Sequence, residues 1–313
     1  MRIMSSTNIL VIGIGGGGGN AIDRMMQCKV RGIELIAINT DIQDLKKVRA
    51  HKKLHIGKES TGGLGAGMNP DLGKKAAQEN IEQIAELFKD TEMVFLVAGL
   101  GGGTGGGAIP IIAELAKKKG ILTIVVVIKP FSFEGSWRMR LADRALENLK
   151  GRVDTLLIIP NDHILKMSEE DTQVISAFWK ADEVLRQAVQ GISDLITLPG
   201  IINVDFADMK SIMKNSGRAV FGTGKAKGEN RIELALDQAL NSPLLNLSIE
   251  GAKGVLFNMA GSKDMSLSEI NEAAKIIKNK VSPQAKIIFG ALHDKSLKTG
   301  EVKITVIATG FNK

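Results

Sequence analysis

The sequence predicts an α/β fold in which a parallel-sheet domain is joined by one long helix to a second, smaller mixed α/β domain. Three observations support this prediction. Apolar strand-length runs alternate with helical patterns from residue 8 to about 165, a long helical stripe follows, and shorter strand and helix patterns fill the rest. The 313 residues also exceed the size at which a single core stops growing. We expect residues 1–171 to form the first domain, 172–199 the connecting helix and 200–313 the second domain.

The first domain is predicted from short apolar runs. Residues 9–12 and 93–98 read as buried strands, and each leads through a glycine-rich segment into a helical pattern. Residues 34–39 and 121–128 are further strand-length runs. No apolar run reaches the ~18 residues of a membrane span, so we expect no direct membrane insertion.

The connecting helix is predicted from Thr172 to Leu198, before Pro199 and Gly200. At about 1.5 Å per residue it would be roughly 40 Å long. Its apolar residues recur in alternating steps of four and three: Val174, Phe178, Ala181, Leu185, Ala188, Ile192 and Leu195. The second domain follows from strand patterns at 255–258, 286–289 and 303–307 and helical patterns at 234–240 and 268–278.

The most informative stretches are two glycine-rich segments, GIGGGGGN (13–20) and GLGGGTGGG (99–107). Each lies between a strand and a helix, where glycines let backbone N–H groups and a helix N-terminus face an anion at close range. A flexible linker would not be inserted at such a place. Two anion cradles acting on one ligand indicate a nucleoside di- or triphosphate.

Neither segment ends in the Gly-Lys-[Ser/Thr] of a P-loop, so no lysine is available there to neutralise phosphates. Charge compensation would come from helix dipoles and a divalent cation, Mg²⁺ above all, and we assign it no protein ligands. Thr104 is the only hydroxyl in the second segment. It fits a phosphate donor and a helix N-cap equally well.

The first glycine segment has a rival interpretation when taken alone. Gly13, Gly15 and Gly18 satisfy the G-x-G-x-x-G dinucleotide fingerprint, and Asp41 lies near the position of its ribose-binding acid. That pattern would indicate a nicotinamide-dependent oxidoreductase. The second glycine segment is not part of such a fingerprint.

Composition narrows the class of protein. The net charge is +7, but the lysines are scattered and the chain has no tyrosine, which favours a solvated basic surface over nucleic-acid binding. The single cysteine, Cys28, excludes an intramolecular disulfide and fits a reducing, cytoplasmic compartment. Its place beside Met25 and Met26 predicts an inert, packed thiol.

Two side-chain pairs have both a structural and a functional interpretation. Phe178 and Asp182 share a helix face, where a ring can stack on guanine and a carboxylate can accept its N1 and N2 hydrogens. Periodicity alone favours the alternative, a core phenylalanine and a solvated charge. Glu134 and Arg138 form an i,i+4 pair that by itself is a surface salt bridge.

With both glycine segments in view, the sequence resembles the FtsZ family of tubulin-like GTPases, which act in bacterial cell division. The resemblance keeps the family's motif order over nearly all of residues 8–311 and argues against the oxidoreductase. Besides the glycine segments, it is carried by IAINTD (36–41), GLGAGMNP (63–70), KPFSFEG (129–135), IPND (159–162), GISDLIT (191–197), NVDFAD (203–208) and TVIATGF (305–311).

The resemblance implies GTP or GDP as ligand, with Mg²⁺ and a monovalent cation such as K⁺, and it assigns residues. Base contacts fall on Asn20, Asn161, Phe178 and Asp182. Glu134 and Arg138 would contact the ribose and phosphate region, and Ala66, Gly67 and Met68 match the loop that senses the terminal phosphate. The phosphate cradles comprise Gly16, Gly17, Gly18, Gly99, Gly101, Gly102, Gly103, Thr104 and Gly105.

Hydrolysis needs an oriented water and a proton acceptor, and neither glycine segment contains a carboxylate. The candidates are Asp205 and Asp208, with Asn203 before them, although this spacing is also that of a helix cap. By the length of the connecting helix, this segment is too distant to reach its own nucleotide. The resemblance implies that it completes the site of the next subunit, in a head-to-tail contact that builds an open filament.

Two departures from the family pattern affect these expectations. Gly106 stands where the family usually has a second threonine, so affinity or turnover would be reduced, and a nucleotide-binding relative that does not hydrolyse is a second hypothesis. The sequence ends at Lys313, without the linker and peptide through which the family binds membrane-tethered division proteins. By resemblance we expect a cytoplasmic protein at midcell, with itself as its main partner.

Overall fold

The computed structural model describes residues 7–30, 32–166, 173–198, 200–242, 248–294 and 296–311. Thr172 and Pro199, at the predicted ends of the connecting helix, lie outside these ranges, as does Lys313. By its internal contacts the chain divides into two units, Met1–Gln190 and Gly191–Lys313. None of the described helices is long and apolar enough to cross a membrane.

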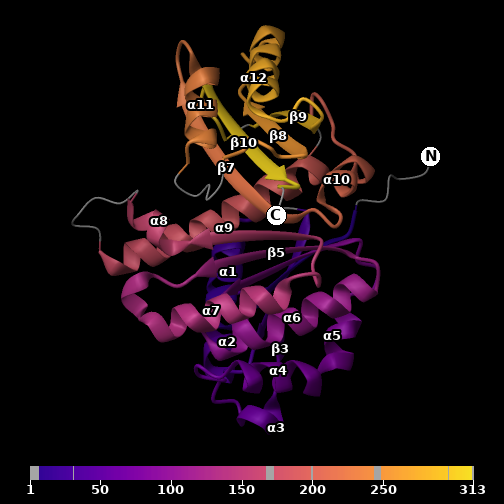
Figure 1. Cartoon of the computed structure of the whole chain (residues 1–313), viewed down its shortest axis with the longest axis vertical. Coiled ribbons are helices and arrows are strands. Elements are labelled where there is room, and N and C mark those ends of the chain that lie inside the picture. Colours follow the sequence, from indigo (N-terminus) through magenta and orange to yellow (C-terminus); the bar gives the residue numbers. More distant parts are fainter. Residues whose placement is uncertain are drawn as a thin grey trace. The chain divides into compact units, whose positions relative to one another are not determined.

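The first unit is built on a parallel sheet, as the alternation of strands and helices predicts (Figure 1). Its strand order is β3-β2-β1-β4-β5-β6. Each strand pairs with its neighbours in parallel. The strands are β1 (Ile9–Ile14), β2 (Ile33–Asn39), β3 (Lys52–His55), β4 (Met93–Gly99), β5 (Leu122–Lys129) and β6 (Thr155–Pro160).

Helices cover both faces of this sheet. Leu10, Ile12 and Ile14 of β1 belong to one buried core with α4, α5, α6 and α7, whereas Gly13 faces Ile22 of α1 on the other side. This alternation follows from the two-residue period of a strand. The helices of the unit are α1 (Gly15–Gln27), α2 (Ile42–Lys47), α3 (Lys58–Thr61), α4 (Pro70–Glu79), α5 (Ile81–Leu87), α6 (Gly103–Lys118), the 3₁₀ turn η1 (Ser132–Glu134), α7 (Ser136–Leu149) and α8 (Asn161–Lys166).

The glycine-rich segments differ from loops in one respect: most of their glycines are helical. α1 begins at Gly15 and α6 at Gly103, each directly after its strand or after a short turn. The prediction of a packed thiol is wrong. Cys28 is the C-cap of α1 and is exposed, because the helix ends there and its buried face stops at Met25.

The long helix, α9, runs from Val174 to Thr197, close to its predicted bounds. The middle and end of its apolar stripe are buried, with Ala181, Leu185, Ala188, Ile192 and Leu195 all at most 6% exposed. Phe178 departs from this pattern, because 40% of its surface is exposed. A core phenylalanine at this position is therefore the poorer interpretation.

The second unit is mixed α/β, as predicted. Its strand order is β7-β10-β8-β9, in which β10 is antiparallel to β7 and β8, and β8 is parallel to β9. A core of apolar side chains lies between the sheet and the helices α11 and α12. The elements are α10 (Phe206–Met213), β7 (Gly217–Lys227), α11 (Arg231–Leu240), β8 (Gly254–Gly261), α12 (Leu267–Lys280), β9 (Lys286–His293) and β10 (Glu301–Thr309).

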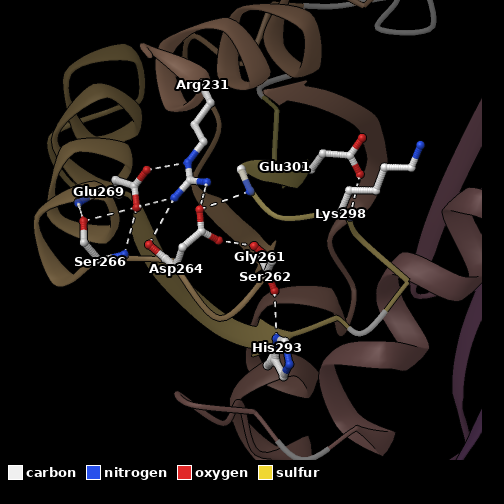
Figure 2. Close-up of polar contacts among 10 residues, drawn as sticks. Arg231, Gly261, Ser262, Asp264, Ser266, Glu269, His293, Lys298 and Glu301 are labelled. Atoms are coloured by element: carbon white, nitrogen blue, oxygen red, sulfur yellow. Dashed lines mark hydrogen bonds and ion pairs between the residues drawn. The ribbon is translucent and has the colours of Figure 1, made fainter. Parts of the chain in front are cut away.

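A buried arginine joins several of these elements (Figure 2). Arg231, the first residue of α11, donates two hydrogen bonds to Glu269 of α12, at 2.6 and 2.9 Å. It also donates to the Asp264 carboxylate at 2.7 Å, and Asp264 in turn accepts from the Gly300 amide at 3.1 Å. The guanidinium therefore ties α11, the start of α12 and the turn before β10 together.

Candidate nucleotide site

The candidate site lies where the order of the first sheet reverses. From β1 the chain continues to β2 and β3 on one side, and later to β4, β5 and β6 on the other. β1 and β4 are neighbours in register, with Ile14 beside Ala98, so α1 and α6 both begin at the carboxyl end of this pair. Ligands of open α/β sheets bind in the crevice at such a switch point.

The two glycine-rich segments meet at this point. A Cβ on Gly17 would lie 3.1 Å from the Gly99 backbone, and one on Gly15 would lie 3.1 Å from the Gly105 nitrogen. The helices α1 and α6 have no side-chain hydrogen bond at their N-caps, Ile14 and Gly102. The first N–H of α6, that of Gly103, donates to the Gly67 carbonyl oxygen at 2.6 Å. No side chain of the described residues caps the other N–H groups in the first turns of the two helices, so these can bind an anion, with the positive ends of both dipoles behind them.

A cavity of about 530 Å³ opens in front of these helix ends. Among the predicted residues, it is lined by Gly16, Gly17, Asn20, Ala66, Gly67, Gly99, Gly102, Gly103, Thr104, Gly105, Glu134, Arg138, Asn161, Phe178 and Asp182. The sequence analysis assigned no ligand contact to several others: Gly15, Asn39, Asp44, Leu64, Gly65, Leu100, Ile128, Lys129, Pro130 and Ala181. Asn39 and Lys129 are the last residues of β2 and β5. Their position at the carboxyl edge of the sheet is the sequence signal that could have predicted their place in the cavity.

Three predicted ligand contacts do not line this cavity: Gly18, Gly101 and Met68. Gly18 is on the face of α1 that packs against β4, where a Cβ would lie 2.5 Å from the Val97 carbonyl oxygen. Gly101 has a φ of +94°, which suits glycine at a turn. Met68 is 50% exposed next to Gly67. Gly18 thus has a packing role here, and Gly101 has a role in a turn.

Thr104 does not cap α6, since the N-cap is Gly102 and Thr104 lies inside the first turn. Its hydroxyl is buried and lies 2.6 Å from the hydroxyl of Thr40, which follows β2. The pair links the second glycine segment, which follows β4, to the end of β2, on the other side of β1. Of its two predicted roles, the N-cap is therefore wrong.

The cavity is also lined by residues predicted to hold a base. The Phe178 ring meets Phe131 edge to face at 5.1 Å, which fixes the ring while leaving it partly exposed. Asn161 is 4% exposed, and its Oδ1 accepts no hydrogen bond from the described residues. A buried, unpaired acceptor in a cavity is costly unless a ligand donates to it.

Asp182 lines the same cavity. Burial raises the pKa of Asp182 to about 7, and the positive charge of Arg24 opposes this only in part. Arg24 itself lies 3.5 Å from the Glu183 carboxylate. A carboxylate that titrates near neutrality inside a cavity is a marker of a binding or catalytic site.

Positive charge in the cavity is limited and already paired. Arg138 donates to Glu134 at 3.3 Å, and Lys129 donates to Asp143 at 2.8 Å. Glu134 also accepts from the Phe131 amide at 2.9 Å. Phosphates in this cavity would therefore depend on backbone N–H groups, helix dipoles and a cation.

The residues present fit a cation that arrives with the nucleotide. Asp41 and Asp44 line the cavity beside the first glycine segment, although Asp41 caps α2 and Asp44 accepts from Asn39 at 2.8 Å. The described part of the chain contains no group of three or more His, Cys, Asp or Glu side chains that could hold a metal ion. Mg²⁺ typically binds one or two carboxylates together with substrate phosphates, so such a group is not required.

The predicted catalytic segment belongs to the second unit. Asp205 is the N-cap of α10 and accepts from the Asp208 amide at 2.6 Å, so the capping interpretation holds for it. Asn203 accepts from the Gly200 amide at 2.7 Å. The Asp208 side chain is 52% exposed, and its carboxylate lies 3.9 Å from Lys286 Nζ.

Comparisons with known proteins match the chain to one family. Residues 8–169 match the model of the tubulin/FtsZ family GTPase domain, and residues 217–312 match that of the FtsZ family C-terminal domain. An empty FtsZ dimer from M. jannaschii is 44% identical with a TM-score of 0.93, covering 98% of this chain and 89% of that one. The W319Y mutant of M. jannaschii FtsZ is also 44% identical, with a TM-score of 0.93 and coverage of 98% and 92%.

The fold is also similar to that of a protein with lower sequence identity. CetZ2 from Haloferax volcanii, solved as a GTPγS-bound protofilament, is 21% identical with a TM-score of 0.81, covering 98% of this chain and 94% of that one. The family match excludes the oxidoreductase interpretation of the first glycine segment. The chain therefore belongs to the tubulin/FtsZ family and carries that family's guanine-nucleotide-binding GTPase domain.

Proposed function

We propose that this protein hydrolyses GTP in a site shared between two copies that stack head to tail, and that the resulting filament serves cell division. Residues 1–171 form the GTP-binding domain, residues 172–199 connect the domains and add Phe178 and Asp182 to the nucleotide site, and residues 200–313 present the catalytic segment to the next copy. The proposal extends the family's GTPase activity to an assembly-dependent one. The FtsZ dimer and the CetZ2 protofilament are relatives that self-associate.

One observation carries the proposal: each carboxylate in the cavity already has another partner or role. Asp41 caps α2, Asp44 accepts from Asn39, and Glu134 pairs with Arg138. The remaining carboxylate of the cavity, Asp182, is assigned with Phe178 and Asn161 to the base. An acceptor for the attacking water must therefore come from elsewhere, and Asp208 is exposed in the second unit.

The residues of the segment around Asp208 have different roles. Asp205 and Asn203 use their side chains to fix the backbone, so their roles are to position the start of α10. Asp208 projects from the first turn of that helix with both carboxylate oxygens beyond hydrogen-bond distance of Lys286 Nζ. We assign to Asp208 the orientation of the water and the acceptance of its proton.

In the nucleotide-binding half, the α- to γ-phosphates lie along the N-termini of α1 and α6. Gly16, Gly17, Gly102, Thr104 and Gly105 supply backbone donors, and Ala66 and Gly67 border the terminal phosphate. Mg²⁺ would neutralise charge on the phosphates, and Asp41 or Asp44 would be the carboxylates that help to hold it. The guanine stacks on Phe178 and donates to Asp182 and Asn161, while Asn20 contacts it from α1.

A contact between the nucleotide face of one copy and the α10 face of the next is heterologous and does not close on itself. Such contacts propagate into open filaments. Because the shared nucleotide lies in the contact, its hydrolysis weakens the contact and allows turnover. By family, such a filament would lie in the cytoplasm at the division site and recruit division proteins.

The test is phosphate release from GTP over about a hundredfold range of protein concentration, with light scattering read in parallel. We expect specific activity to switch on above a threshold concentration together with scattering. Asp208→Asn and Asp208→Ala should bind nucleotide normally but lose about a hundredfold or more in turnover. Glu272→Ala removes an exposed carboxylate from α12 and serves as the matched control, with wild-type turnover.

Two outcomes would contradict the proposal. Activity strictly proportional to protein concentration would show a self-contained hydrolase. Normal hydrolysis by both Asp208 variants would show that the acceptor lies elsewhere. Stable polymer without phosphate release would instead support the non-hydrolysing relative.

A further inference from the structure

Lys286 and Ser211 lie beside Asp208 on the second unit. Lys286 is the first residue of β9, while Ser211 and Asp208 are one turn apart on α10. Lys286 Nζ donates to Ser211 Oγ at 2.6 Å, and the Ser211 hydroxyl donates to the Asp208 carbonyl oxygen at 2.5 Å. The ammonium is thus held by a hydroxyl that is itself anchored to the Asp208 backbone.

This arrangement keeps the ammonium near the Asp208 carboxylate without a hydrogen bond to it. The distance from Lys286 Nζ to Asp208 Oδ1 is 3.9 Å, which allows electrostatic attraction but is too long for a hydrogen bond. A direct contact would occupy a carboxylate oxygen that a water needs. Among the described residues, Lys286 is the cation within ion-pair distance of Asp208.

We propose that Lys286, tethered by Ser211, is a positioning residue for Asp208 in the shared hydrolytic site. The inference rests on the proposed function, because it assigns a role in that same site. Its physical basis is charge: Asp205 and Asp208 must approach the phosphates of a neighbouring copy, and like charges repel at that distance. A fixed ammonium beside Asp208 offsets this repulsion and restricts the orientation of the carboxylate.

Two lysines in α10 or at its end have surroundings that differ from those of Lys286. Lys210 Nζ lies 5.8 Å from the centre of the Phe206 ring, and Lys214 is the exposed C-cap of the helix. The Lys286 and Asp208 side chains are each 52% exposed. An exposed pair of this kind contributes little to folding, so an effect on turnover can be separated from an effect on stability.

The experiment compares variants at a protein concentration well above the assembly threshold. Lys286→Met should lower kcat about fivefold while leaving GDP affinity and the unfolding temperature unchanged, because the nucleotide cavity is lined by the first unit. Lys286→Arg, which keeps the charge, should recover most of the turnover. Lys214→Met removes the same charge from a nearby exposed site and should hydrolyse at the wild-type rate.

A double substitution tests whether Ser211 acts through Lys286. Ser211→Ala should lower kcat about twofold, and adding it to Lys286→Met should cause no further loss, since both act through one ammonium. Wild-type turnover in Lys286→Met, with Asp208→Asn inactive, would overturn this inference and leave the shared site standing. A loss not recovered in Lys286→Arg would also overturn it. Wild-type activity that is simply proportional to protein would remove the proposed function and this inference together.

Discussion

Asp182 is the residue whose chemistry is most sensitive to its surroundings. Its pKa is raised by burial to about 7 from an ordinary value of 3.8, so near neutrality it is part protonated. The proposed role requires the carboxylate, because only the ionised form accepts from both N1 and N2 of guanine. Nucleotide binding should therefore release a proton when the solution is near or below pH 7.

We predict that GDP affinity falls about tenfold between pH 8 and pH 6, following the fraction of ionised Asp182. Isothermal titration calorimetry at several pH values checks this. Asp182→Asn should flatten the pH dependence and reduce the preference for GTP over ATP, and measuring it in parallel subtracts the titration of the phosphates. A pH profile that is identical in the variant would contradict the role of Asp182.

The raised pKa of Asp182 also affects the stability of the protein without nucleotide. Since the folded-state pKa lies above the ordinary value, ionisation costs stability as the pH rises through about 4 to 7. Asp182→Asn removes this cost, so the empty variant should melt at a higher temperature than the wild type at pH 8. At pH 4 the two should be similar.

At the scale of one residue, the sequence identified most of the residues that line the cavity, but it did not separate them from neighbours that only pack. Gly16, Gly17 and Gly18 are identical in type and adjacent, yet only the first two line the cavity. Gly18 faces β4 because a helix turns by 100° per residue. Phe178 could be separated from the core stripe only by its exposure, which depends on the neighbouring Phe131.

Among the elements, α6 shows why its glycines are not equivalent. A Cβ on Gly106 would meet Ala145 of α7 at an ordinary 3.5 Å, whereas one on Gly107 would lie 2.0 Å from the Pro70 carbonyl oxygen. Gly107 is therefore required by the close packing of α4 on α6. Gly106 does not line the cavity, which weakens the expectation that its departure from the family pattern impairs nucleotide affinity.

We predict that Gly106→Ala stabilises the protein by about 0.5–1 kcal/mol, because alanine loses less backbone entropy in a helix. Gly107→Ala is the matched variant one residue away, and it should destabilise by about 1–3 kcal/mol or prevent folding, since backbone must move. Thermal unfolding of both variants gives the comparison. Equal effects of the two substitutions would mean that α4 and α6 are not packed as described.

The strand β7 is one of the elements that the sequence analysis did not predict. Its residues, Gly217 to Lys227, mix glycines and lysines and contain no long apolar run. Gly224 is there because α11 packs directly on the strand, where a Cβ would lie 2.0 Å from the Ala235 carbonyl oxygen. Elements with continuous apolar runs or a long stripe, such as β5 and α9, were predicted close to their observed bounds.

For the whole molecule, the fold class followed from the order of motifs, because each strand that leads into a glycine-rich helix start fixes a part of the parallel sheet. The shared site stays a prediction for a physical reason. Its residues have ordinary local roles within one copy, as Asp205 caps a helix and Asn203 accepts from a turn. Their second role depends on a surface supplied by another copy.

In the second unit, the contacts of Arg231 can be tested for their contribution to stability. Arg231 is 7% exposed and supplies the donors that connect α11 with Glu269 and Asp264. The Ser262 hydroxyl, and then Arg231, hold the pKa of Asp264 at about 2, and Arg231 also lowers the pKa of Glu269. Depressed carboxyl pKa values stabilise the fold above about pH 4, and this stabilisation is lost as the pH falls toward 2.

We predict that Arg231→Met destabilises this unit by about 1–3 kcal/mol near neutral pH, because it leaves the partly buried Glu269 without its cationic partner. Arg231→Lys keeps the charge but not the planar arrangement of donors, so its stability should lie between those of the wild type and Arg231→Met. The difference between wild type and Arg231→Met should shrink as the pH is lowered from 5 to about 2, when Glu269 becomes protonated. GDP affinity should not change in either variant, since the nucleotide cavity is lined by residues of the first unit. Hydrogen exchange of α11 and α12 amides across this pH range checks the prediction, and protection that is the same in wild type and Arg231→Met at pH 7 would contradict it.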